Sequence, residues 1–383
     1  MTSTRGFPNE EYQHRVKAAQ RQMAQADLDA LLLTTEPEMR YFTGFLTRFW
    51  ESPTRPWFVL LPQSGTPIAI IPSIGAHLMG QSWISDIRTW RSPDYTDDGV
   101  NLLADAISEF VPQNGRIGVP SDMESHLRMP LTSWAALKSA VEPRVMVHDH
   151  SIMRTLRMVK SPREIEKIRT ACAVADCSFA RVKEIAQTGA PLDAVFREFQ
   201  ILCLQEGADW VAYLAGGAGP GGYGDVIAPA VSKPLEDGDV LMLDTGVVFD
   251  GYFCDFDRNF AIGTVSGAVD DAYAQLLEAT DQAFELARPG ITAADLFHCM
   301  DRIVAGGEVA GRLGHGLGMQ LTEWPSLIAA DRTKLVPGMV LTLEPGIEIA
   351  SGQTLVHEEN IVITETGAEY LSTPAPRQLP RLI

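Results

Sequence analysis

Five acidic or histidine side chains in the second half of the sequence stand in apolar, strand-like surroundings, where an unpaired charge is costly to bury. Each alone has a structural explanation, such as a capped turn or a tight loop. Together, four carboxylates and one imidazole would repel one another and lose hydration unless cations lie between them. The set therefore predicts a binding site for two divalent metal ions, formed by Asp244 in VLMLDTG, Asp255 in GYFCDFD, His315 in GRLGHGLG, Glu344 in LTLEPGI and Glu358 in LVHEENIVI.

The types of ligand narrow the choice of metal. A set that is mostly oxygen, with one nitrogen and no sulfur, suits Mn, Fe, Co or Zn and disfavours a sulfur-rich structural zinc site. Two such ions that share a water lower its pKa from about 15.7 towards about 7, which supplies hydroxide at neutral pH. A site of this kind hydrolyses its substrate without a serine or cysteine nucleophile.

Strands must carry most of these residues. Residues 238–263 predict two antiparallel strands that turn at Asp250-Gly251, and the segments 335–349 and 354–364 are also strand-like. Helices are predicted at about 266–287 and 292–305. The Gly-rich segment 215–224 is expected to be a loop, and it lacks the G-K-[ST] ending of a phosphate-binding loop. Because strands and helices are interleaved without a steady βαβ rhythm, we expect an α+β fold with a mainly antiparallel sheet here.

A second domain precedes this one. The chain of 383 residues exceeds the size at which one hydrophobic core usually stops growing. Residues 9–150 alternate between helix and strand, which indicates an α/β sheet with a hairpin formed by 56–62 and 66–72. The run SPRE at 161–164 has the pattern of a capping box, and the helical periodicity behind it continues to about residue 187. We therefore predict domains at 1–155 and 156–383.

Composition limits the partners and the compartment. A net charge of −18 argues against nucleic acid, because phosphate binding needs basic surface. The sequence contains no run of 18 apolar residues, so no membrane span is predicted, and the first 22 residues lack the apolar core of a signal peptide. Five cysteines without a C-x-x-C spacing indicate reduced, mostly buried thiols. We expect a cytoplasmic protein.

Several motifs resemble metallopeptidase family M24, the group of prolidase, aminopeptidase P, methionine aminopeptidase and creatinase with the pita-bread fold. The likeness lies in LMLDTGVVFDGYFCD, GHGLG, LEPGI and Glu358. The spacing of the ligands agrees as well: 11 positions separate the two aspartates, 29 separate His315 from Glu344, and 14 separate Glu344 from Glu358. The runs YFTGF (41–45) and KSPREIEKIR (160–169) resemble the creatinase/prolidase branch, in which a smaller N-terminal domain precedes the catalytic domain.

The resemblance implies a role for each ligand. Asp244 would chelate the first metal, Asp255 and Glu358 would bridge both, and His315 and Glu344 would complete the second. Glu344 is then the candidate general acid/base, with His315 beside it.

The resemblance also reaches the residues next to the ligands. Arg258 matches an arginine of the family that could orient a carboxylate, and Asp257 stands where the family has threonine. For Asp257 an extra charge beside the metals and a solvated side chain are both open. His357 replaces a family arginine, and either a supporting or a structural role fits it.

Two substrate-contacting histidines of the family are absent. Their positions hold Ile227 and Thr322, and the loss of such donors usually costs a factor of about 10² to 10³ in rate. The groups that could replace them in contacting the substrate are Tyr223, Asp225, Gln320 and Thr322. We expect cleavage of Xaa-Pro dipeptides or short peptides, with two alternatives: an M24 enzyme for another small molecule, such as a creatinase-like or ectoine-hydrolase-like C–N hydrolase or a dimethylsulfoniopropionate-lyase-like enzyme, and a non-catalytic binding protein.

The N-terminal half offers two weaker signals. In this branch a loop of the neighbouring subunit often borders the active site, so we expect a homodimer in which Arg48, Trp50 or Arg55 reaches across to the substrate. His148 and His150 have the look of a metal pair, but a surface or interdomain role is favoured for them.

Overall fold

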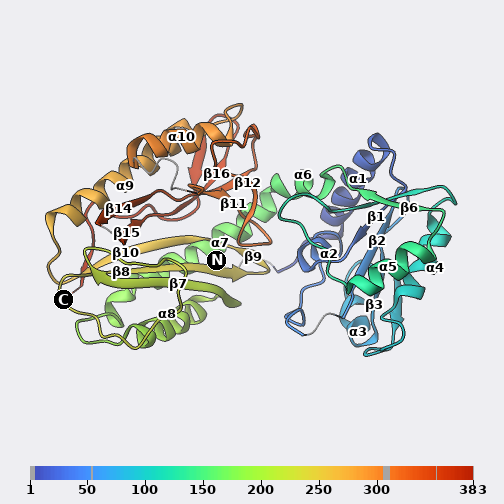
Figure 1. Cartoon of the computed structure of the whole chain (residues 1–383), viewed down its shortest axis with the longest axis horizontal. Coiled ribbons are helices and arrows are strands. Elements are labelled where there is room, and N and C mark those ends of the chain that lie inside the picture. The colour runs from blue at the N-terminus through green and yellow to red at the C-terminus, as the bar shows by residue number, and fades with distance from the viewer. Residues whose placement is uncertain (1–4, 53–54, 305–310, 351, 383) are drawn as a thin grey trace. The chain divides into compact units, whose positions relative to one another are not determined.

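The computed structural model describes residues 5–52, 55–304, 311–350 and 352–382, and these form two compact units that divide between Arg157 and Met158 (Figure 1). None of the helices in these ranges is long and apolar enough to cross a membrane.

The N-terminal unit is built on a mixed six-stranded sheet in the order β4-β3-β2-β1-β5-β6. The predicted hairpin forms, since β2 and β3 pair antiparallel. The central strand β1 has the sequence ALLL and is buried throughout, as a strand covered on both faces must be. The strands are β1 (Ala30–Leu33), β2 (Phe58–Pro62), β3 (Ile68–Pro72), β4 (Asp86–Trp90), β5 (Arg116–Val119) and β6 (Val145–His148), and the helices are α1 (Asn9–Gln25), α2 (Glu36–Thr43), α3 (Ala76–Met79), α4 (Val100–Phe110), α5 (Leu131–Ala140) and α6 (Ile152–Met158).

The C-terminal unit begins with the predicted capping box. The Ser161 hydroxyl accepts a hydrogen bond from the Glu164 amide at 3.3 Å, and the Glu164 carboxylate accepts one from the Ser161 amide at 2.9 Å. The helix that follows, α7 (Pro162–Ala180), ends earlier than the predicted residue 187 because the chain tightens into a 3₁₀ turn at Val182–Glu184. Helix α8 (Leu192–Glu206) comes next.

The first sheet of this unit has the order β18-β10-β8-β7, with β9 paired to β8. The predicted turn between β8 and β9 forms at Asp250 and Gly251, which have φ of 49° and 78°. The predicted Gly-rich loop is wrong over 215–220, because this segment is the second half of β7. Gly216 explains the difference: its φ is 145° and a Cβ there would overlap the Met242 carbonyl, so only glycine fits this strand position. The strands are β7 (Trp210–Pro220), β8 (Asp239–Phe249), β9 (Tyr252–Phe253), β10 (Phe256–Ile262) and β18 (Arg381–Leu382).

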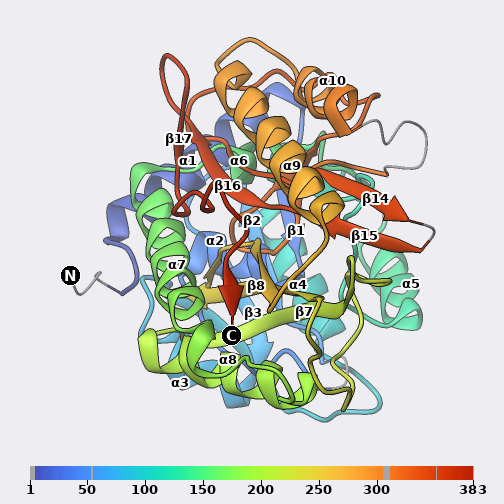
Figure 2. The ribbon, with the colours of Figure 1, turned by 90° about the vertical axis from the view of Figure 1, so that its left-hand side faces the viewer.

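The second sheet is antiparallel, in the order β12-β11-β13-β16-β17, and a two-stranded ribbon of β14 and β15 extends from it. Both sheets lie between the pair α7–α8 and the pair α9–α10 (Figures 1 and 2). The two predicted helices are observed, although residue 305, the predicted end of the second, lies outside the described residues. The elements are α9 (Gly267–Leu286), α10 (Ala293–Val304), β11 (His315–Gly316), β12 (Glu323–Ser326), β13 (Val340–Leu343), β14 (Gly346–Ala350), β15 (Gln353–Val356), β16 (Glu359–Ile363) and β17 (Ala368–Tyr370).

Candidate metal centre

The first sheet brings its aspartates to one face. Asp244 lies in the middle of β8 and is paired with Asp257 on β10, while Asp255 precedes β10 by one residue. Side chains of an extended chain alternate between faces, so residues two apart share a face. Asp255 and Asp257 therefore lie on the same face, and Asp244 faces them from the neighbouring strand.

The second sheet supplies the two glutamates at breaks between strands. Glu344 lies between β13 and β14, and Glu358 lies between β15 and β16. Leu343 pairs with Glu359 across β13 and β16, which brings the two breaks side by side. The carboxylates thus leave the backbone where the chain passes from the five-stranded sheet into the ribbon.

His315 lies in β11 between two glycines that the packing requires. A Cβ on Gly314 would overlap the carbonyl oxygen of Thr342, and a Cβ on Gly316 would overlap that of Trp324. Two other backbone segments can therefore approach the histidine closely from both sides. Such close approach is the usual reason for glycine inside a strand.

The five side chains converge on one cavity of about 310 Å³. The Nε2 atom of His315 lies 2.8 Å from Oε1 of Glu344 and 3.3 Å from Oδ2 of Asp255. The potential ligand atoms form two groups, one of Asp255, His315 and Glu344 and the other of Asp244, Asp255 and Glu358. Asp255 belongs to both groups, which is the geometry that two adjacent cations with a shared carboxylate need.

Hydrogen bonds orient the imidazole. The Nδ1 atom of His315 lies 2.8 Å from the carbonyl oxygen of Gly316 and donates its proton there, so Nε2 faces the carboxylates and is the nitrogen available to a metal ion. The Thr342 hydroxyl accepts the His315 amide at 2.9 Å and donates to Oε1 of Glu344. One threonine therefore fixes both a nitrogen and an oxygen ligand position.

The electrostatics of the cluster fit bound cations. Burial and the neighbouring carboxylates raise the pKa of Asp244 and of Glu358 well above the ordinary values, and burial raises the pKa of Asp255 to about 6. Burial alone would lower the pKa of His315, but Glu344 and Asp255 raise it to about 10. Oδ1 of Asp244 and Oε2 of Glu358 are buried and, within the described residues, have no hydrogen-bond partner. Divalent cations supply the missing positive partners, so these donors fit a dinuclear site.

Asp257 supports the cluster instead of facing solvent. It is fully buried, and its Oδ1 accepts the Glu358 amide at 2.7 Å while its Oδ2 accepts the Asn259 side-chain amide at 3.1 Å. His357 lies between Asp257 and Glu359, with nitrogen–oxygen distances of 3.6 and 3.4 Å. Burial disfavours its charged form, yet these two carboxylates raise the pKa of His357 above its ordinary value.

Arg258 completes this buried charge network. Its guanidinium lies 3.0 Å from Oε2 of Glu359 and donates to the Glu358 carbonyl, also at 3.0 Å. Although burial opposes ionisation, Arg258 and His357 hold the pKa of Glu359 at about 2. Two positive and two negative side chains therefore balance behind the cluster, and both Asp257 and Arg258 fix the backbone of Glu358.

Of the residues predicted to contact the substrate, some line the cavity and others do not. Thr322 and Ile227 line the cavity, and Ile227 is exposed. Tyr223 does not line it: this side chain is buried in the core, where its hydroxyl accepts the Val356 amide at 2.7 Å. Asp225 does not line it either, because its carboxylate caps the backbone amides of residues 227 and 228. Trp50 belongs to the N-terminal unit, in which it packs against Trp57 and Arg128.

Two polar residues that line the cavity, Tyr213 and Arg312, are not among the site residues predicted from the sequence. Tyr213 projects from β7, and burial together with the acidic cluster raises the pKa of its phenol, so this group stays a hydrogen-bond donor. Arg312 lies in the loop before β11 and donates to the Thr322 hydroxyl at 3.3 Å. The available signal was the position of this arginine three residues before the histidine in GRLGHG.

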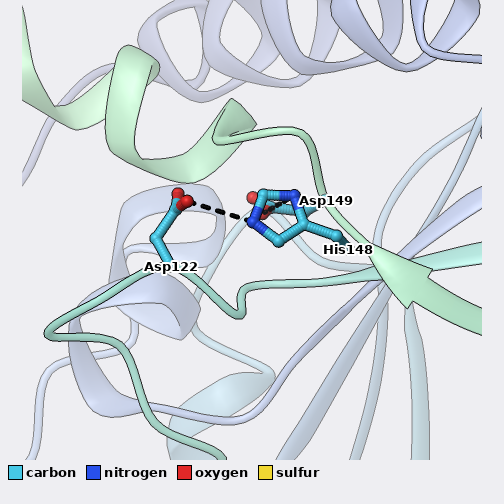
Figure 3. A group of neighbouring side chains, drawn as sticks. All are labelled: Asp122, His148 and Asp149. Atoms are coloured by element: carbon cyan, nitrogen blue, oxygen red, sulfur yellow. Dashed lines mark hydrogen bonds and ion pairs between the residues drawn. The ribbon is translucent and has the colours of Figure 1, made fainter.

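A third group of potential ligands lies in the N-terminal unit, formed by Asp122, His148 and Asp149 (Figure 3). The His150 amide donates to Nδ1 of His148 at 2.8 Å, so Nε2 carries the proton and donates to Asp122 at 3.0 Å. The Asp149 carboxylate accepts amides at the start of α6. Hydrogen bonds within the protein therefore account for this group, and neither nitrogen of the imidazole has a lone pair left for a metal.

The fold and the paired ligand groups define a metal-dependent peptidase of the pita-bread type. The model of metallopeptidase family M24 matches residues 166–365, and that of the creatinase/prolidase N-terminal domain matches residues 15–159. The chain belongs to metallopeptidase family M24, which confirms the predicted resemblance and the predicted α+β class. Membership of this family implies divalent metal ions at the site.

Known relatives are similar to this chain in sequence and structure over most of its length. The chain is 30% identical to a probable dipeptidase PepE of Mycobacterium tuberculosis over 371 residues, which cover 95% of each protein. It is 32% identical to an Xaa-Pro dipeptidase of Pyrococcus furiosus over 72% of this chain and 78% of the relative. The crystal structure of dipeptidase PepE from Mycobacterium ulcerans superposes with a TM-score of 0.85 at 28% identity, and covers 98% of this chain and 99% of that one. The prolidase of Pyrococcus horikoshii gives a TM-score of 0.81 at 25% identity, covering 94% and 99%.

Proposed function

We propose that the chain is a dinuclear Xaa-Pro dipeptidase. The observation that carries the proposal is the pair of ligand groups that share Asp255 at the wall of a small cavity. The relatives described above are named dipeptidases, Xaa-Pro dipeptidases or prolidases. We assign residues 156–383 to the catalytic domain and residues 1–155 to the domain that precedes it.

Asp244 would hold one cation and His315 and Glu344 the other, with Asp255 and Glu358 shared by both. Manganese, cobalt, iron or zinc suits these oxygen and nitrogen donors. When bound, such a pair supplies a water of lowered pKa and polarises the carbonyl of the scissile bond.

The protein's own groups have distinct tasks in this scheme. Glu344 would take the proton of the attacking water and return it to the leaving amine, since its carboxylate faces the cavity. Thr342 holds Oε1 of Glu344, which leaves the other oxygen for the proton. The Tyr213 phenol lines the same cavity as a donor and would support the negative charge that develops on the substrate oxygen.

The size of the cavity favours a short substrate. Ligand pockets usually span about 300 to 1,000 Å³, and this one has about 310 Å³. A panel of Xaa-Pro dipeptides, Xaa-Ala dipeptides and non-peptide amides, assayed with Mn²⁺ or Co²⁺, tests the proposal. Turnover of Xaa-Pro dipeptides supports it. If only the non-peptide compounds react while the metal is bound, the small-molecule alternative is correct instead.

Asp255→Asn provides the matching test of the site. The amide keeps the shape but loses the charge shared by both ligand groups, so we expect activity to fall by at least about 1,000-fold. Elemental analysis of the same sample checks whether both cations are lost. Appreciable activity with two bound ions would contradict the ligand assignment.

We further propose that the enzyme is a cytoplasmic homodimer. The five cysteines are unpaired, as expected for a reducing compartment. In the dimer, Arg48, Trp50 or Arg55 of one subunit would border the active site of the other. Solution scattering and activity measured on one sample test this arrangement, and a fully active monomer would refute it.

A further inference from the structure

The charges on the wall of the cavity are strongly unequal. Four carboxylates line it, those of Asp244, Asp255, Glu344 and Glu358. Beside the histidine, the one cationic side chain among the described residues that line it is Arg312. Two divalent cations neutralise the four carboxylates, and the guanidinium then remains as net positive charge. A cavity of this kind attracts an anionic group.

Arg312 has donors to spare. A guanidinium carries five N–H groups. Within the described part of the chain, the hydrogen bond found for this side chain is the single one to the Thr322 hydroxyl, and Arg312 itself is exposed. The remaining donors are available to a ligand in the cavity.

The hydrogen-bond partner of Arg312 is the residue that stands in place of a family histidine. Thr322 occupies the position at which the sequence resemblance implies a substrate-contacting histidine. A threonine side chain is too short to replace that imidazole, but its hydroxyl accepts from the arginine at 3.3 Å. The lost donor and positive charge are therefore compensated by a residue from a different loop.

We propose that Arg312, positioned by Thr322, binds the free terminal carboxylate of the dipeptide. This inference rests on the proposed function and specifies its substrate class. A planar guanidinium pairs with a carboxylate through two parallel hydrogen bonds, which match neither an amide nor a peptide bond. The enzyme therefore selects substrates with a free carboxylate next to the leaving residue, so dipeptides are preferred to tripeptides and to dipeptide amides.

The experiment compares an Xaa-Pro dipeptide with its C-terminal amide on the metal-loaded protein. The wild type is expected to have a kcat/KM at least about 10- to 100-fold higher for the acid, the range of one hydrogen-bonded charged group. Arg312→Met should remove this preference, chiefly by raising KM for the acid, and leave the amide almost unchanged. Arg312→Lys keeps the charge but loses the paired geometry, so an intermediate preference is expected.

Two further variants separate positioning from charge. Thr322→Val removes the hydroxyl acceptor and should lower the acid preference, whereas Thr322→Ser restores it. Arg332→Met is the matched control, since this arginine is exposed, does not line the cavity and changes the net charge equally. Melting curves verify that each variant is folded. If Arg312→Met does not fold, the preference of Arg312→Lys for the acid over the amide is the test.

The outcomes distinguish the two levels of the proposal. A wild type without acid preference, or an Arg312→Met that loses acid and amide turnover equally, overturns the role of Arg312 and leaves the peptidase intact. If the metal-loaded wild type cleaves neither substrate nor any other dipeptide, the proposed function fails and this inference fails with it.

Discussion

Asp244 and Asp257 are directly paired across β8 and β10, although like charges in opposing positions of a sheet repel one another. The structure resolves the conflict by giving the two carboxylates different partners. Asp244 belongs to the ligand cluster, and Asp257 is held by the amides of Glu358 and Asn259 and by the neighbouring His357. One aspartate thus belongs to a group of potential metal ligands, and the other holds the backbone of Glu358, a further potential ligand.

This relationship predicts the effect of Asp257→Asn. Both oxygens of Asp257 accept hydrogen bonds, so an asparagine must turn its NH₂ group towards a second donor in either orientation. We expect metal affinity to fall about 10- to 100-fold, as is usual when a residue behind a ligand is changed. Metal titration followed by calorimetry measures it.

Asp94→Asn is the matched control for this change. Asp94 is partly exposed and, among the described residues, accepts its hydrogen bonds through Oδ1 alone, an oxygen that asparagine retains. Equal metal affinity in wild type and Asp257→Asn would show that Asp257 has no part in presenting Glu358.

Removal of the metal should make stability depend on pH. In the metal-free fold the pKa of Asp255 is raised from 3.8 to about 6 and that of His315 from 6.5 to about 10. Raised values mean that the folded chain holds these protons more tightly than the unfolded chain, so the stability they contribute is lost as pH rises. For Asp255 this loss occurs between about pH 3.8 and pH 6, and for His315 between about pH 6.5 and pH 10. We therefore expect His315 to make the melting temperature of the chelated protein fall between about pH 6 and pH 10. The lowered pKa of Glu344 acts in the opposite sense only below 4.5, outside this interval.

Added Mn²⁺ is the control for the pH experiment. Bound cations replace the protons as positive partners, so the metal-loaded protein should show a much flatter dependence over the same interval. A chelated protein whose melting temperature stays constant or rises from pH 6 to pH 10 would contradict the electrostatic account of the cluster.

The close packing around His315 predicts the cost of a single methyl group. In Gly316→Ala the new Cβ overlaps the Trp324 carbonyl, which belongs to backbone that cannot easily move. We expect a loss of stability of about 1 to 3 kcal/mol and weaker metal binding, measured by denaturation and titration. Gly311→Ala, in the loop before β11 with open space around it among the described residues, should be neutral. If both variants were equally stable, the steric role of Gly316 would be disproved.

A buried ion pair between Lys160 and Glu323 gives the fourth prediction. The two side chains are 1% and 2% exposed and lie 3.0 Å apart, and Glu323 also accepts the amides of Met319 and Gln320. Lys160→Met removes the ammonium group beside the buried Glu323 carboxylate, so the free energy of unfolding should fall by about 3 to 5 kcal/mol.

The double variant Lys160→Met with Glu323→Gln should recover most of this loss. The glutamine still accepts the two loop amides but carries no charge. Urea denaturation of the wild type, Lys160→Met and the double variant measures the difference. A double variant no more stable than Lys160→Met would mean that the charge of Glu323 is not the cause.

The ligand cluster could be predicted from the sequence because its physics is local. An acid such as Asp244 or Glu344 in an apolar stretch of sequence can be recognised from its type and its neighbours along the chain, and the turn at Asp250-Gly251 is specified by its own two residues. The capping box at Ser161 is equally local, since its two partners are three positions apart.

What could not be predicted depends on contacts between distant segments. Gly216 lies in a strand because Met242 requires a close approach, which no neighbour along the chain reveals. Tyr223 was expected at the substrate, yet it is anchored to Val356 more than a hundred residues away. The one local signal for Arg312 is its position three residues before His315, and its proposed role depends on the acidic cavity that it lines.

The breaks between strands that hold Glu344 and Glu358 place these two acids independently of the ribbon between them. Because the pairing of β13 with β16 fixes these two acids beside each other, the ribbon of β14 and β15 between them is an excursion that starts and returns at the same place. Insertions or deletions within that ribbon would leave the two acids in register. The hairpin can therefore differ in length or sequence at its tip without moving the two acids apart.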